Sequence, residues 1–130
     1  MRNLSEMSPS ALAYLGDAVL ELYVREFLVS RGICSSKELN DAALEFVRAH
    51  AQSAALENIL PMLTEHETEV FKNGRNNNKV SVPKSASALD YRRATGFETL
   101  FGYLHLSGEK ARMDELFAEA YKDTIKKYNT

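Results

Sequence analysis

Two carboxylates stand in stretches so apolar that an acid there needs a reason. Asp17 lies within Y-L-G-D-A-V-L-E at 14–21, and Glu98 lies within T-G-F-E-T-L-F-G at 95–102. A carboxylate is costly to bury unless it is paired, hydrogen-bonded or bound to a cation. We therefore expect both acids at near-core positions, and we interpret them as a shared metal site built from two helices.

The ligand chemistry of such a pair favours a hard cation. Neither motif contains His or Cys, and oxygen-only ligands favour Mg²⁺, or Mn²⁺ as a substitute, over zinc. Magnesium often takes only one or two carboxylates and completes its shell with water and substrate phosphate. Two acids are therefore enough for a site that acts on a phosphate. The ordinary alternative is that each acid faces solvent or pairs with a base, as Asp17 could with Arg25.

Glycines accompany the two acids. Gly16 precedes Asp17, and Gly96 and Gly102 lie on either side of Glu98. A glycine inside a helix costs about 1 kcal/mol relative to alanine. Close packing of the helices that carry the acids is the simplest reason for this cost.

The elements that position these acids are helical. Four helix starts carry capping signals: Ser8-Pro9, Ser35 with Glu38, Thr64 with Glu67, and Ser87 with Asp90. Apolar residues recur at three-to-four spacing and no segment alternates like a strand. The expected helices cover about 9–30, 36–47, 50–60, 65–73, 88–106 and 109–128. The sequence predicts an all-α fold of about six helices in one domain, 1–130.

The composition narrows the class of protein. A single cysteine, Cys34, excludes an internal disulfide and a cysteine-based zinc site. No run approaches 18 apolar residues, and the first residues contain no apolar signal core. We therefore expect a soluble cytoplasmic protein without a membrane segment.

Charge is unevenly distributed along the chain. The net charge is −2, but the segment 72–93 contains six bases and one acid, whereas the remainder contains 10 bases and 17 acids. The segment is therefore +5 on a body of −7. A local basic patch on an acidic protein is compatible with a polyanionic partner that binds one face.

Both acidic motifs resemble those of one enzyme family. Y-L-G-D-A-V-L-E-L-Y-V resembles the signature helix of the ribonuclease III family, and T-G-F-E-T-L-F-G-Y-L resembles its second acidic helix. The short length and the stretch G-R-N-N-N-K are similar to Mini-ribonuclease III, the form without a separate double-stranded-RNA-binding domain. The resemblance covers nearly the whole chain.

The resemblance implies a fold and a reaction. It implies a ribonuclease III-type helical endonuclease domain that forms a homodimer and cleaves double-stranded RNA with Mg²⁺, leaving 5′-phosphates. It also implies maturation of the large-subunit (23S) ribosomal RNA precursor as the biological role. Asp17 and Glu98 match the family's catalytic, metal-binding acids. Full-length members carry further acids where this chain has Ser10, Ala13 and Thr95, which leaves the number of metal ions open.

The basic segment supplies candidate RNA contacts. Arg75, Lys79, Lys84, Arg92 and Arg93 are expected to bind RNA phosphates, because duplex RNA is recognised mostly through shape, 2′-hydroxyls and phosphates. Two other interpretations remain at this point. A ribonuclease III-like domain that binds RNA without cleaving it would tolerate the missing acids. A structural helical module would show no dependence on divalent ions.

Overall fold

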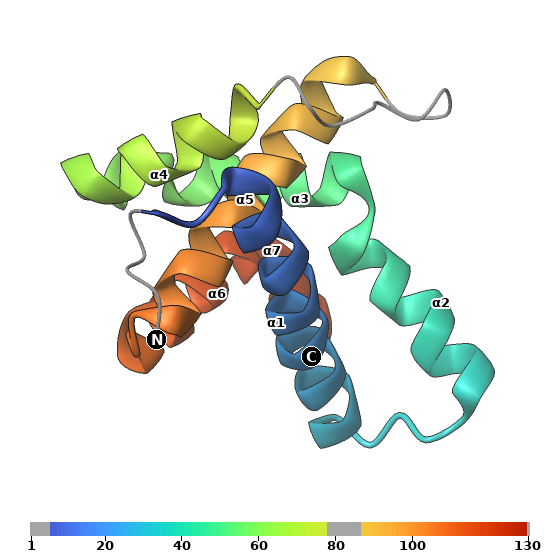
Figure 1. Cartoon of the computed structure of the whole chain (residues 1–130). Coiled ribbons are helices and arrows are strands. Elements are labelled where there is room, and N and C mark those ends of the chain that lie inside the picture. The colour runs from blue at the N-terminus through green and yellow to red at the C-terminus, as the bar shows by residue number, and fades with distance from the viewer. Residues whose placement is uncertain (1–5, 78–86, 130) are drawn as a thin grey trace.

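The chain is a bundle of helices in which two long helices cross at the centre (Figure 1). The computed structural model describes residues 6–77 and 87–129. Within these ranges it contains no strand, so the predicted all-α class is confirmed. The elements are α1 (Pro9–Ser30), α2 (Ser36–Val47), α3 (Ala49–Ile59), a 3₁₀ turn η2 (Leu60–Met62), α4 (Glu65–Arg75), α5 (Ala88–Leu106), α6 (Lys110–Ala120) and α7 (Lys122–Lys127).

Helix α5 is the centre of the bundle. It contacts α1, α3, α4 and α6, and in Figure 1 it is largely surrounded by these neighbours. Phe97, Leu100 and Phe101 are fully buried. A helix that is apolar on several faces is stable only when other elements cover it. A polar side chain on the covered part of α5 is therefore held in a fixed environment.

Most of the predicted helix starts are confirmed. The Ser8 hydroxyl accepts a hydrogen bond from the amide of Ala11 at 3.1 Å, with Pro9 in the first turn. Thr64 and Glu67 form a complete capping box. Side-chain caps of this kind satisfy amides that have no partner inside the helix. These local signals could be identified from the sequence because each depends on residues three positions apart.

The prediction of one final helix over about 109–128 is wrong. The chain breaks at Tyr121, where φ is −105° and ψ is 21°, so α6 and α7 are separate and the described residues form seven α-helices. The Tyr121 ring is buried and its hydroxyl donates to the Phe46 carbonyl of α2 at 2.8 Å. After the break, Tyr128 packs against Phe27 and Phe46. These contacts are long-range, and helical periodicity does not reveal them.

The backbones of α1 and α5 touch where the two helices cross. A Cβ atom at Gly16 would lie 1.7 Å from the carbonyl oxygen of Glu98, and one at Gly102 would lie 2.0 Å from the carbonyl oxygen of Leu12. The predicted close packing is confirmed at both glycines. Gly96 serves a different contact, because a Cβ there would lie 2.6 Å from the Phe71 ring of α4.

The α1–α5 contact predicts a large effect of one methyl group. Gly16→Ala should lower the free energy of unfolding by about 3 kcal/mol or more, because the methyl overlaps main-chain atoms and the helices must separate. This loss would exceed the gain of about 1 kcal/mol in helix propensity. Urea denaturation measures the difference. Ala118→Ser, at an exposed position of α6, is the control, and a Gly16→Ala protein as stable as wild type would contradict the close approach.

Candidate functional site

The crossing of α1 and α5 brings the two predicted acids together. Gly16 lies against the main chain of Glu98, so the next residue, Asp17, stands beside the Glu98 side chain. The side chain of Asp17 lies within hydrogen-bonding reach of the Glu98 carboxyl group, an arrangement that favours a proton on one member of the pair. Residues 81 positions apart in sequence thus form one acidic pair.

The two acids differ in exposure. Glu98 is half-buried between α1 and α3, whereas Asp17 is exposed. The expectation of a near-core position is therefore wrong for Asp17. Gly16 and Leu20 occupy the buried stripe of α1, and Asp17 lies at the edge of this stripe, where no described helix covers it. One carboxylate of the pair is thus open to solvent and the other is largely enclosed.

Burial and nearby negative charge alter the acidity of the pair. Burial raises the pKa of Glu98 to about 8, and the charge of Asp17 together with its hydrogen bond adds to this shift. The more distant Glu21 acts in the same direction, whereas a hydrogen bond from Gln52 opposes it. Two carboxyl groups this close do not both ionise readily at neutral pH. A positive ion is the natural alternative to a proton on Glu98.

The donor set suits a hard divalent cation. It consists of two converging carboxyl groups, and the described residues contain no group of three or more His, Cys, Asp and Glu placed to hold a metal. Magnesium needs only one or two carboxylates when water and phosphate complete its shell. At the position of the additional family acid, the buried Thr95 hydroxyl donates to the Tyr91 carbonyl within its own helix at 2.9 Å.

Gln52 is a site residue that the sequence analysis missed. It lies on α3, its side chain is 2% exposed, and it hydrogen-bonds Glu98. A signal was available, because Gln52 shares the buried face of α3 with Ala55, Leu56 and Ile59. A polar residue on a largely apolar, buried helix face usually has a specific partner.

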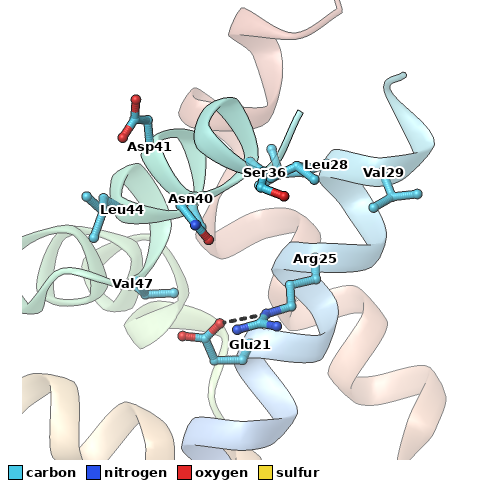
Figure 2. Close-up of a pocket in the computed structure, with 11 residues that line it drawn as sticks. Glu21, Arg25, Leu28, Val29, Ser36, Asn40, Asp41, Leu44 and Val47 are labelled. Carbon is cyan, nitrogen blue, oxygen red and sulfur yellow. Dashed lines mark hydrogen bonds and ion pairs between the residues drawn. The ribbon is translucent and has the colours of Figure 1, made fainter. Parts of the chain in front are cut away.

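A groove opens between α2 and the C-terminal half of α1 (Figure 2). Its volume is about 530 Å³. Glu21, one turn after Asp17, lies at its wall and pairs with Arg25 at 3.2 Å. Arg25 is thus bound to Glu21 and does not pair with Asp17. Neither Asp17 nor Glu98 lines the groove.

The structure describes three of the five predicted RNA-contact residues, namely Arg75, Arg92 and Arg93. Lys79 and Lys84 lie outside the described residues. Arg92 is exposed, and Arg75 lies 5.4 Å from the centre of the Phe71 ring.

Arg93 is engaged within the protein. Its guanidinium pairs with Glu57 at 2.5 Å and reaches the Ser53 carbonyl at 3.4 Å, and its side chain is 17% exposed. Arg75, Arg93 and Lys72 line one cleft of about 300 Å³ between α3, α4 and α5. The structure therefore brings three bases of the segment 72–93 together, one of them already paired. In the part of the chain that the structure describes, no helix is long and apolar enough to cross a membrane.

Comparison with known proteins identifies the family. The model of the ribonuclease III domain matches residues 10–109. Mini-ribonuclease 3 of Symbiobacterium thermophilum is 43% identical over 120 residues, which cover 92% of each chain. Mini-ribonuclease 3 of Enterococcus faecalis is 43% identical over 118 residues, or 89% of each chain. A crystal structure of a Fusobacterium nucleatum protein superposes with a TM-score of 0.84 at 25% identity, over 95% of this chain and 98% of the other. The chain therefore belongs to the ribonuclease III family of endoribonucleases, and within it to the Mini-ribonuclease 3 group.

Proposed function

We propose that this protein is a Mg²⁺-dependent endoribonuclease that cleaves double-stranded RNA at the Asp17–Glu98 pair. The convergence of these two carboxyl groups at the α1–α5 crossing carries the proposal. Membership of the ribonuclease III family supports the reaction class. Mn²⁺ is expected to substitute for Mg²⁺, because both accept oxygen ligands.

The two acids have different tasks in this proposal. Asp17 and Glu98 would hold Mg²⁺, which would supply positive charge to a phosphate oxygen and make a bound water more acidic. Asp17, which is exposed, offers its carboxylate on the side from which RNA approaches. Glu98, which is half-buried and held by Gln52, would release the proton of its own carboxyl group when a cation binds. Binding is therefore coupled to the release of a proton.

The family and the charge distribution support the proposed substrate. We propose the 23S ribosomal RNA precursor as the biological substrate, on the strength of the resemblance to Mini-ribonuclease III. The basic segment 72–93 is the proposed phosphate-binding surface. Arg92 is exposed and available to RNA. Arg75, Lys79 and Lys84 complete the set, whereas Arg93 would have to leave Glu57 to take part.

We also propose a homodimer, supported by an exposed apolar face of α1. Ala11, Tyr14, Ala18, Leu22 and Val29 recur at helical spacing and are all exposed. Tyr14 is 86% exposed and Leu22 is 58% exposed. Exposed apolar residues that gather on one helix face can mark an interface. Since Tyr14 lies one turn before Asp17, such a dimer would place its interface next to the active site.

The cleavage test uses a stem of the ribosomal RNA precursor. Asp17→Asn keeps the shape of the side chain and removes its charge, so cleavage in Mg²⁺ should fall at least about a hundredfold. A chelator should abolish cleavage by the wild-type protein. Glu26→Gln, an exposed acid on the same helix, is the control and should cut normally. Equal cutting by wild type and Asp17→Asn would make Asp17 structural. Binding of the stem without cutting by either protein would favour the non-catalytic RNA-binding domain.

The proton held by the pair predicts a pH dependence of cation binding. Because the pKa of Glu98 is raised to about 8, a divalent cation must displace a proton below this pH and need not do so above it. Apparent Mn²⁺ affinity should rise about tenfold per pH unit up to about pH 8 and then level off. Calorimetry in buffers of different ionisation enthalpy should count about one proton released per ion at pH 6.5. Affinity that is independent of pH between 6 and 9 would contradict a proton on Glu98.

Salt dependence tests the basic segment. A variant with Lys79, Lys84 and Arg92 all replaced by Ala should bind duplex RNA more weakly, and its plot of log K against log salt should be flatter by up to about two to three units. The matched control replaces Lys122, Lys126 and Lys127, three exposed lysines of α7. Unchanged affinity and slope in the triple variant would remove this segment from the RNA-binding surface.

Sedimentation tests the dimer. At micromolar concentration the wild-type protein should sediment as a dimer, and Leu22→Glu should sediment as a monomer because it places a charge in the apolar strip of α1. Leu89→Glu is the control, since Leu89 is 63% exposed but lies on α5, outside this strip. A wild-type protein that is monomeric throughout the micromolar range would refute the homodimer.

A further inference from the structure

Gln52 differs from the other buried polar residues in the partner it reaches. Buried Glu67 is bound by Arg112, and buried Thr95 bonds a carbonyl of its own helix. Gln52, with 2% of its surface exposed, extends from α3 to the carboxyl group of Glu98 on α5. A buried amide that hydrogen-bonds a half-buried acid does more than fill space in the core.

The helix that carries Gln52 is fixed against α5. Arg93 of α5 binds the main-chain carbonyl of Ser53, the residue after Gln52, at 3.4 Å and the Glu57 carboxylate at 2.5 Å. This contact lies five residues before Glu98. The backbone at Gln52 is therefore held at a fixed position relative to Glu98. This fixes the distance that the Gln52 side chain spans to reach the Glu98 carboxyl group.

The chemistry of an amide suits this position. A neutral amide donates to a carboxyl group whether the acidic pair holds a proton or a cation. A lysine or arginine at the same place would pair with Glu98 and compete with a metal ion for its charge. A hydrocarbon side chain would leave the Glu98 oxygens without a donor on this side. Gln52 thus orients Glu98 without neutralising it.

We propose that Gln52 is a positioning residue, whose amide holds the Glu98 carboxylate beside Asp17 so that the pair is preorganised for a divalent cation. This inference rests on the proposed function, because it assigns Gln52 a role toward the same cation. Outer-sphere groups that orient metal ligands typically change metal affinity by 10- to 100-fold when they are replaced. Gln52 acts through Glu98.

The test compares Gln52→Met with wild type and with Ser53→Ala. Methionine matches the length of glutamine and removes the donor, whereas Ser53 is a buried polar neighbour on α3. Mn²⁺ binding by the RNA-free protein, followed by electron paramagnetic resonance, should weaken about 10- to 100-fold in Gln52→Met and remain unchanged in Ser53→Ala. The Mg²⁺ concentration for half-maximal cleavage should shift by a similar factor. Gln52→Asn, whose amide is one methylene shorter, should also weaken binding.

A double-mutant cycle shows whether Gln52 acts through Glu98. In a Glu98→Gln background, Gln52→Met should change Mn²⁺ binding little further, because the group it orients is gone. Additive losses would overturn the positioning role, as would a Gln52→Met protein that has a lower melting temperature but wild-type Mn²⁺ affinity. If wild type itself bound no Mn²⁺, the proposed function would fail together with this inference. Normal binding by wild type, loss in Asp17→Asn and no change in Gln52→Met would overturn the inference alone.

Discussion

The rest of the structure depends on the direct contact between the main chains of α1 and α5. Gly16 and Gly102 allow each helix to approach the carbonyl groups of the other, at a distance that a single methyl group would prevent. This contact sets the position of every side chain near the crossing. Asp17 directly follows Gly16, and Glu98 lies one turn before Gly102. The separation of the two acids is therefore determined by backbone packing and not by flexible side chains.

The crossing also creates electrostatic repulsion between the carboxyl groups of Asp17 and Glu98. Two carboxyl groups that are partly removed from water do not both ionise easily. The pKa of Glu98 is therefore raised, first by burial and then by the charge of Asp17. A proton on Glu98 would remove this repulsion in the free protein, and a bound cation is proposed to remove it in the active enzyme. Gln52 and the Arg93–Glu57 pair fix α3 against the same region of α5. The acidic pair is therefore supported from three helices, although only two of them carry an acid.

The accuracy of the sequence predictions followed the range of the interactions on which they depend. The caps at Ser8 and Thr64 involve neighbours three residues away, and both were correct. The break at Tyr121 depends on a hydrogen bond to Phe46 of α2, 75 residues away, and was missed. Asp17 was expected near the core because its neighbours are apolar. Its exposure depends on which helices cover α1, and helical spacing does not contain this information.

The sequence by itself determined the helical class, the main helix starts, the two acids and the family motifs, because these depend on local spacing and residue type. Its glycines also indicated close helix packing, but not which residues of the other helices each glycine contacts. Only the tertiary structure decided that Asp17 and Glu98 meet at the helix crossing, that Gln52 bonds Glu98, and that Arg93 is paired with Glu57. The physical reason is that each of these contacts joins different helices. Its geometry and its effect on pKa arise from how those helices pack, which no single segment specifies.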